Sequence, residues 1–116
     1  MKRTLAESVR HAMHGLIIAF QSQKNLRIHS VVALIVLIAA FVLGISRGEL
    51  IILVVMIALV FSAEFLNTAL EMLSDILNPR VSAQVGRLKD VSAAGVLTVS
   101  FAALTVGLLI FIPYIF

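Results

Sequence analysis

Three long apolar stretches constrain the fold of this chain more than any other feature of its sequence. The first, LRIHSVVALIVLIAAFVLGI, has about twenty residues, which at about 1.5 Å of rise per residue is the length of a membrane-crossing helix. The second begins near residue 50, and the third, from residue 91, carries no formal charge. The composition, 61% hydrophobic and 13% charged, lies outside the usual range of soluble domains. We therefore predict an all-α integral membrane protein with one domain, residues 1–116, and transmembrane helices at about 26–46, 50–77 and 91–116.

Residues 1–25 have a different pattern, which is typical of a helix that lies in the membrane interface. Apolar residues recur in steps of three and four from Leu5 to Phe20, and polar residues such as Glu7 and Arg10 fall largely off this stripe. A further transmembrane span is the alternative, but its charges lie in the first turns and its uninterrupted apolar run is short. We predict an N-terminal amphipathic surface helix and no cleaved signal peptide.

The basic residues predict the orientation in the membrane. They precede the first span or lie between the second and third, with a single exception in the remaining loop: Lys2, Arg3, Arg10, Lys24, Arg27, then Arg80, Arg87, Lys89, and the exception Arg47. By the positive-inside tendency the N-terminus is cytoplasmic and the C-terminus lies outside a multi-pass plasma-membrane protein. A net charge of +3 without a basic tract predicts no nucleic-acid partner.

A polar stripe interrupts the second apolar stretch at its cytoplasmic end. In SAEFLNTALEMLSD, at about 100° per residue, the polar side chains share a face about 80° wide: Glu64, Asn67, Glu71 and Asp75. A carboxylate that faced lipid would cost a few kcal/mol, so this face must look into protein, a polar cavity or a bound cation. A structural seam between helices is the alternative, but a single amide or hydroxyl normally suffices for that. The stripe therefore indicates function.

The chemistry of the stripe admits several kinds of function. Closely spaced carboxylates near Arg87 and Lys89 could hold a divalent cation on phosphate oxygens and leave another carboxylate as general base. The chain has no P-loop and no GxGxxG string, so any nucleotide binds by another design. A small ion-coupled transporter also uses membrane carboxylates, but no comparable polar path crosses the outer half of any span. A noncatalytic membrane subunit is the third alternative.

Three motifs carry a resemblance to a known family. EFLNTALEMLSD, KDVSAAGVL from Lys89, and NLRIH at 25–29 resemble the signature of the prokaryotic diacylglycerol kinase and undecaprenol kinase family, with similarity from about residue 8 to the C-terminus. The resemblance implies a small lipid kinase of the bacterial plasma membrane with a surface helix and three spans. It also implies a homotrimer with active sites shared between subunits. The implied reaction transfers the γ-phosphoryl group of MgATP to the hydroxyl of a membrane lipid.

The resemblance also implies roles for individual residues. Glu64 would be the general base for the lipid hydroxyl, and Glu71 would coordinate Mg²⁺ and thereby the ATP phosphates. Lys89 and Asp90 would place the nucleotide, and Asn67 and Asp75 would orient these groups from the stripe; a structural role is the alternative for each of these four. Arg27 and His29, in the NLRIH motif, are predicted to contact the lipid substrate beside Glu64. His11 and His14, three residues apart on the surface helix, could touch one ligand, and we include His11 among the ATP contacts.

Two departures from the family pattern affect this interpretation. The family usually has a metal-binding glutamate where this chain has Gln23, whose amide oxygen can coordinate Mg²⁺ but brings no charge. Glu7 is an alternative source of a carboxylate. The family's YH pair is replaced by Val81 and Ser82, so an attenuated relative is a further alternative. On substrate, the NLRIH motif and the final FIPYIF favour undecaprenol, with diacylglycerol as the alternative.

Overall fold

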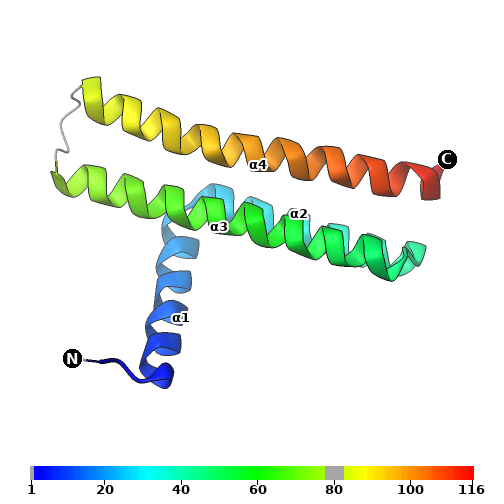
Figure 1. Cartoon of the computed structure of the whole chain (residues 1–116), viewed down its shortest axis with the longest axis horizontal. Coiled ribbons are helices and arrows are strands. Elements are labelled where there is room, and N and C mark those ends of the chain that lie inside the picture. Colours follow the sequence, from blue (N-terminus) through cyan, green and yellow to red (C-terminus); the bar gives the residue numbers. More distant parts are fainter. Residues whose placement is uncertain (1, 78–82) are drawn as a thin grey trace.

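The computed structural model describes residues 2–77 and 83–116, and these form four helices. They are α1 (Leu5–Ser22), α2 (Lys24–Leu43), α3 (Arg47–Leu77) and α4 (Ala83–Ile115). Helices α2, α3 and α4 run side by side, and α1 extends away from the bundle at the start of α2 (Figure 1). Within the described residues the fold is helical, and α2, α3 and α4 are each long and apolar enough to cross a membrane, which confirms these parts of the prediction.

Helix α1 begins and ends at residues that satisfy its free backbone groups. The Thr4 hydroxyl accepts a hydrogen bond from the Glu7 backbone N–H, and the Glu7 carboxylate accepts one from the Thr4 N–H, both at 3.2 Å. This reciprocal capping box satisfies two of the first donors of the helix. Helix α1 is followed by Gln23, a single extended residue with φ −120° and ψ 112° that also precedes α2 and whose N–H donates to the Ala19 carbonyl. Gln23 is therefore the corner between the two helices.

The connection between α2 and α3 is a tight turn with its own caps. Gly44 adopts the left-handed conformation (φ 64°, ψ 45°), which costs glycine no Cβ clash, and its N–H bonds back to the last turn of α2. A second capping box follows, in which the Ser46 hydroxyl accepts from the Glu49 N–H and the Glu49 carboxylate accepts from the Ser46 N–H. These caps turn the chain back so that α3 runs antiparallel to α2 (Figure 1).

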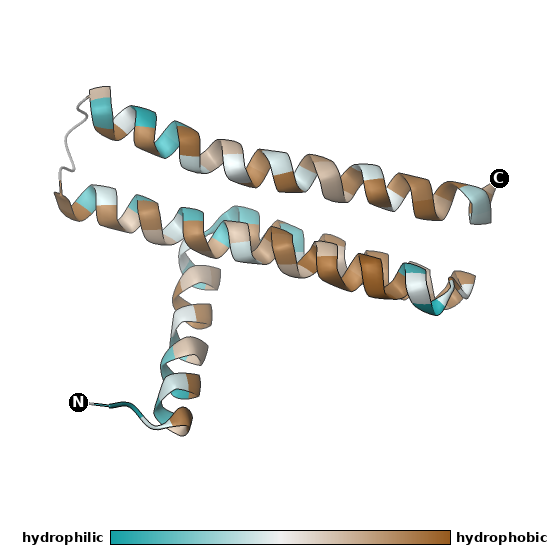
Figure 2. Ribbon diagram, in the orientation of Figure 1, coloured by the Kyte–Doolittle hydropathy of each residue, from teal (hydrophilic) through white to brown (hydrophobic). Residues whose placement is uncertain are grey.

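The apolar core lies at the end of the bundle that holds this turn. Ala40 of α2, Leu53 of α3 and Ile110 of α4 are buried together. Most other large apolar side chains of α2, α3 and α4 are exposed in the single chain. In Figure 2 the polar residues gather toward the opposite end, around the start of α2, the end of α3 and the start of α4. The fold therefore brings the polar parts of three helices to one end.

The start of α4 differs from the prediction. The apolar pattern predicted a third span from residue 91 with Arg87, Lys89 and Asp90 in the loop before it, whereas α4 begins at Ala83 and includes all three. The hydropathy pattern marks only the apolar part of a helix, and AQVGRLKD contains no proline to stop the helix from extending past it. Residues Asn78, Pro79, Arg80, Val81 and Ser82, which were predicted to end the second span and begin this loop, lie outside the described residues.

Candidate functional site

Burial along the polar stripe of α3 changes from one end to the other. Glu64 is buried, with 3% of its surface exposed, Asn67 and Glu71 are half-buried, and Asp75 is exposed. Seven residues separate Glu64 from Glu71, about 10 Å along the helix axis. The stripe therefore presents one carboxylate inside the bundle and others toward its polar end.

Glu64 meets a histidine of α2. His29 Nδ1 lies 2.9 Å from Glu64 Oε1, and the side chain of Glu64 is only 4% exposed. The two atoms approach without the alignment of a hydrogen bond, and neither has another hydrogen-bond partner among the described residues. Ser100 Oγ, on α4, is also buried, and it too has no hydrogen-bond partner among the residues that the structure describes. Buried polar atoms are normally hydrogen-bonded, so this group of atoms is suited to a polar ligand.

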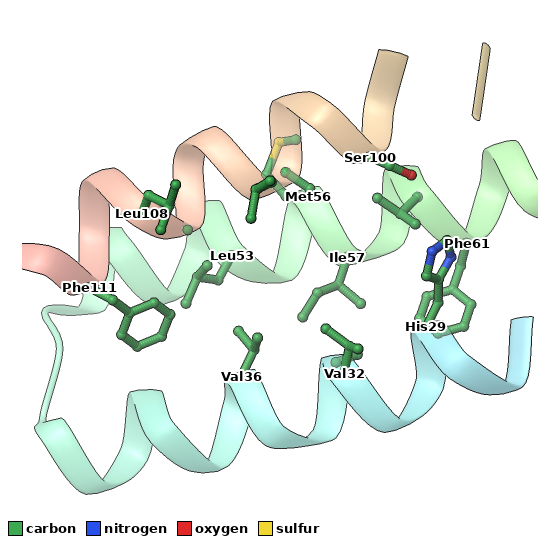
Figure 3. A pocket seen from close by; sticks show the side chains of 15 residues that line it. His29, Val32, Val36, Leu53, Met56, Ile57, Phe61, Ser100, Leu108 and Phe111 are labelled. Carbon is green, nitrogen blue, oxygen red and sulfur yellow. The ribbon is translucent and has the colours of Figure 1, made fainter. Parts of the chain in front are cut away.

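An apolar cavity of about 380 Å³ extends from this group between α2, α3 and α4. His29, Phe61 and Ser100 lie at one end and Leu108 and Phe111 at the other, as Figure 3 shows. The lining is otherwise almost entirely aliphatic, with Val36, Leu53, Met56 and Ile57 along its length. The cavity can therefore take a hydrocarbon chain whose polar end meets His29 and Ser100.

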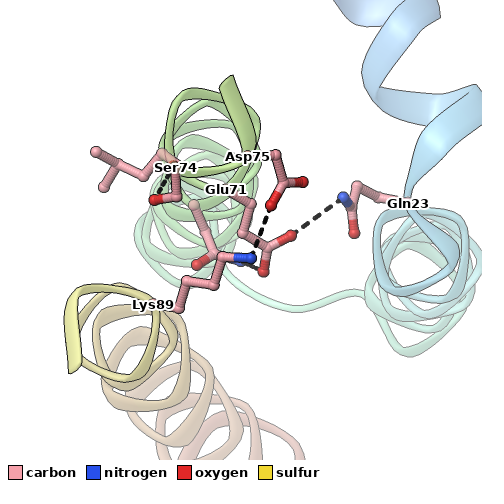
Figure 4. A network of polar contacts seen from close by, with 7 residues as sticks. Gln23, Glu71, Ser74, Asp75 and Lys89 are labelled. Carbon is pink, nitrogen blue, oxygen red and sulfur yellow. Dashed lines mark hydrogen bonds and ion pairs between the residues drawn. The ribbon is translucent and has the colours of Figure 1, made fainter. Parts of the chain in front are cut away.

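Glu71 lies in a network of polar side chains that joins three parts of the fold (Figure 4). Its Oε1 accepts a hydrogen bond from Asn67 Nδ2 at 3.3 Å, and its Oε2 accepts one from Gln23 Nε2 at 3.5 Å. Asn67 Oδ1 in turn accepts a hydrogen bond from the Ser92 hydroxyl of α4 at 2.7 Å. The corner at Gln23 and the start of α4 thus both reach the same carboxylate.

Lys89 and Asp75 form an ion pair at the outer edge of this network. Lys89 Nζ lies 2.8 Å from Asp75 Oδ1, with the two side chains 40% and 61% exposed. A pair this exposed contributes little to stability, because water and salt screen it. Its use is positional, since it places an ammonium group of α4, which can bind an anionic group, beside the carboxylates of α3, which can bind a cation.

A divalent cation can be tested against these donors. No cluster of three or more histidine, aspartate or glutamate side chains suited to a metal ion occurs in residues 2–77 and 83–116. Mg²⁺, however, is usually held by one or two carboxylates together with substrate phosphates and water. Each Glu71 oxygen accepts a single hydrogen bond in the network, so lone pairs remain on both. Glu71, with Gln23 and Asp75 nearby, fits a nucleotide-bound Mg²⁺ and does not form a metal cage by itself.

Other predicted residues lie elsewhere or have other partners. His11 is exposed on α1, eleven residues before Ser22 and about 16 Å from that end of the helix. Glu7, the alternative carboxylate, belongs to the capping box at the far end of α1. Asp90 is exposed on α4. Arg27, predicted at the lipid, donates from Nη1 to the Phe20 and Gln21 carbonyls at 2.6 and 3.2 Å, where it satisfies the last turn of α1.

Two residues of the site were absent from the sequence prediction. Ser92 lies within the KDVSAAGVL motif, but its partner Asn67 is on another helix, and nothing in the local pattern pairs them. Ser100 lies in an apolar stretch where a serine reads as a small packing residue. The available signal was the hydroxyl itself, in a span where most other residues are apolar or small.

Comparison with known proteins identifies the family of this chain. The family model described as prokaryotic diacylglycerol kinase matches residues 10–111. An undecaprenol kinase of Bacillus subtilis is 32% identical over 103 residues, which cover 89% of this chain and 84% of that protein. Diacylglycerol kinases of Synechocystis sp. and Haemophilus influenzae are 34% and 30% identical over 94% and 79% of this chain, and the matches span 63% and 78% of those proteins. The chain therefore belongs to the prokaryotic diacylglycerol kinase family, and its activity is that of an ATP-dependent lipid kinase.

Proposed function

We propose that this protein transfers the γ-phosphoryl group of ATP, with Mg²⁺, to the hydroxyl of a membrane lipid, and that undecaprenol is the preferred lipid. One observation carries the proposal. A buried carboxylate, Glu64, contacts His29 at the polar end of an apolar cavity and lies about 10 Å along its own helix from the Glu71 network. A lipid alcohol and a nucleotide phosphate could approach each other along this stripe.

Glu64 acts as the general base in this proposal. The lipid hydroxyl oxygen attacks the γ-phosphorus, the bond to the ADP oxygen breaks, and the hydroxyl proton passes to the Glu64 carboxylate. His29 approaches the carboxylate from α2, with Nδ1 2.9 Å from Glu64 Oε1, and its ring lines the end of the cavity that would receive the lipid headgroup. The cavity receives the first part of the lipid tail and keeps water from the hydroxyl. Arg27, at the start of α2, contacts the headgroup from outside the cavity while it holds the end of α1.

The Glu71 network holds the nucleotide. Glu71, with Gln23 in support, holds the Mg²⁺ that accompanies ATP. When bound, the ion neutralises phosphate charge and fixes the phosphates in one geometry. Lys89 leaves Asp75 for the phosphate oxygens, and Asn67 keeps Glu71 oriented. Asp90 and His11 contact the outer parts of the nucleotide, His11 from the surface helix.

The preference for undecaprenol depends on sequence motifs alone, because the names of the relatives do not decide between the two lipids. The relatives carry both names, undecaprenol kinase and diacylglycerol kinase, at similar identities. The NLRIH motif and the final FIPYIF favour the undecaprenol branch. Both lipids present a hydroxyl at the interface above a hydrocarbon tail, so Glu64 serves either one, and diacylglycerol is the alternative substrate.

The same proposal includes the assembly and its orientation. Helix α1 lies in the cytoplasmic interface, the polar end of the bundle faces the cytoplasm, and the C-terminus lies outside. Three copies assemble into a homotrimer whose active sites are shared between neighbours, which would cover part of the apolar surface that one chain exposes. Native mass spectrometry from detergent should then give three times the 12.6 kDa chain mass. A single-chain mass under conditions that support activity would exclude the trimer.

The test is phosphoryl transfer by the purified protein in lipid vesicles. With labelled ATP and Mg²⁺, we expect faster product formation from undecaprenol than from diacylglycerol. Glu64→Gln should lower the rate by about a hundredfold or more, because it removes the proton acceptor and little volume. Glu49→Gln is the matched control, since it makes the same change on α3 beyond the far end of the cavity and should retain activity.

Each outcome addresses a separate part of the proposal. No transfer to either lipid by folded wild-type protein would exclude the kinase activity. Faster transfer to diacylglycerol would reverse the substrate preference and leave the rest in place. An active Glu64→Gln variant would remove the base role from Glu64 and favour a noncatalytic or transport function for the stripe.

A further inference from the structure

Ser92 uses its hydroxyl differently from the other helical serines and threonines with described bonds in α2, α3 and α4. Those residues donate to a backbone carbonyl four residues earlier in their own helix: Ser30, Thr68, Ser74, Thr98 and Thr105. Such back-bonding is the common arrangement in a helix. The Ser92 hydroxyl instead donates across to α3, to Asn67 Oδ1 at 2.7 Å. The contact therefore connects two helices at the level of the polar stripe.

This contact fixes which way the Asn67 amide faces. An amide has an oxygen that only accepts and a nitrogen that only donates, and an ionised carboxylate only accepts. If Asn67 turned over, its oxygen would face the Glu71 oxygen and the two acceptors would repel. With Ser92 on Oδ1, Asn67 Nδ2 points at Glu71 Oε1, 3.3 Å away. Ser92 thus donates to the amide oxygen of Asn67, which the Glu71 carboxylate cannot satisfy because it has no hydrogen to donate.

The orientation of Glu71 depends mainly on this chain of contacts. Its second support, from Gln23 Nε2, has a length of 3.5 Å, near the outer limit for a hydrogen bond. Loss of Ser92 would free the Asn67 amide to rotate and would leave Glu71 with the weaker support alone. The two free lone pairs of Glu71 would then lose their fixed direction.

We propose that Ser92 is a positioning residue, which acts through Asn67 to hold the Glu71 carboxylate in the direction needed for the metal–nucleotide complex. The inference depends on the metal-binding role proposed for Glu71 above. Neither the family description nor the names of the relatives assign a role to this serine. The contact links α4 through Asn67 to the proposed metal ligand, so the start of α4 supports the metal–nucleotide complex through Ser92 as well as through Lys89.

The test measures binding of Mn²⁺, as a spectroscopic substitute for Mg²⁺, in the presence of a non-hydrolysable ATP analogue. Electron paramagnetic resonance of free Mn²⁺ gives the dissociation constant without any turnover. Ser92→Ala should raise this constant about tenfold, the lower end of what loss of an orienting partner costs a metal site. Ser92→Thr keeps the hydroxyl and should stay within about twofold of wild type. Thr98→Val is the matched control, because it removes a hydroxyl of α4 that bonds only its own helix.

A double-mutant cycle with Asn67→Ala separates positioning from a general loss of packing. If Ser92 acts through Asn67, Ser92→Ala should change the Mn²⁺ constant little in the Asn67→Ala background. Equal effects in both backgrounds, or wild-type binding by Ser92→Ala, would overturn the proposal while the kinase function stands. If Ser92→Ala does not fold, Ser92→Cys preserves volume with a weaker donor and should give an intermediate constant. Absence of Mn²⁺–nucleotide binding by wild-type protein would overturn both this proposal and the metal role of Glu71.

Discussion

At the scale of single residues, Gln23 has an unusual place. It is the one extended residue between two helices, and its side chain reaches Glu71 on a third. A glutamate here would put two carboxylates side by side, an arrangement that requires a cation. The Gln23 amide instead donates a hydrogen bond to Glu71. The site therefore carries one negative charge fewer and needs no metal ion to offset repulsion between two carboxylates. The structure thus gives a physical reason to expect weak metal binding by the free protein.

Gln23→Glu should therefore lower the Mg²⁺ concentration that gives half-maximal activity, by about tenfold, because a second carboxylate adds a charged oxygen ligand. The same variant should have a lower Tm than wild type without Mg²⁺ and regain it when Mg²⁺ is added, as binding to the folded state predicts. Gln21→Glu adds the same charge at an exposed site two residues away and is the control. An unchanged Mg²⁺ requirement, or an equal change in the control, would show that Gln23 is not at the metal.

At the scale of helices, the corner between α1 and α2 is held by a side chain. The Arg27 guanidinium donates to the Phe20 and Gln21 carbonyls, which the end of α1 leaves free. Arg27 belongs to the first turns of α2, so it ties the direction of α1 to that of α2. If α1 lies in the membrane interface, this contact sets its angle to the spans.

Arg27→Ala should lower the free energy of unfolding by about 1 kcal/mol, because two carbonyls lose their donor. Arg27→Lys should recover only part of this, since an ammonium lacks the planar fork that reaches both oxygens. Thermal unfolding in detergent, with limited proteolysis at residues 20–24, gives the stability and the opening of the corner. Wild-type stability and proteolysis of Arg27→Ala would mean that the contact does not hold α1.

The far end of the bundle has a comparable link between helices. The Tyr114 hydroxyl, near the end of α4, donates to the Glu49 carboxylate, which also caps α3 through Ser46.

Tyr114→Phe should lower Tm by roughly a few degrees, since it removes this link and keeps the ring. In a Glu49→Ala background the same change should have no effect. Tyr114 is the single tyrosine of a chain without tryptophan, so its fluorescence reports this contact directly. A Tyr114→Phe effect that persists without Glu49 would locate the stabilisation in ring packing instead.

At the scale of the whole molecule, the exposed surface of the three long helices is apolar, and the polar groups gather mainly at one end (Figure 2). Such a surface is stable in lipid and would aggregate in water. If all three long helices cross the membrane, the two termini lie on opposite sides of it. The proposed cytoplasmic site requires the N-terminus inside.

Cysteine labelling should test this orientation, because the chain has no cysteine of its own. A membrane-impermeant maleimide should label Phe116→Cys in intact cells and Arg3→Cys only after the membrane is opened. Wild-type protein should remain unlabelled in both conditions. Labelling of Arg3→Cys from outside would reverse the orientation, and labelling of both in intact cells would indicate two populations.

Much of the fold could be predicted from the sequence because it depends on local patterns. Apolar runs of spanning length predicted the three long helices, and the helical repeat put Glu64, Asn67 and Glu71 on one stripe. The start of α4 was missed because the apolar pattern ends before the helix does. The family motifs pointed to the correct family without any knowledge of the contacts.

What the sequence alone determined is therefore the set of helices, the membrane as their surroundings and the polar stripe, since each follows from spacing within a few residues. The tertiary structure decided which side chains meet. Ser92 bonds Asn67, Gln23 bonds Glu71, and His29 contacts Glu64, each across two different helices or a corner. Arg27 bonds the carbonyls of α1, a contact that the sequence did not predict, and its lipid contact stays a prediction. Such pairs depend on the register in which helices pack, and helical periodicity along one segment carries no information about the register of another.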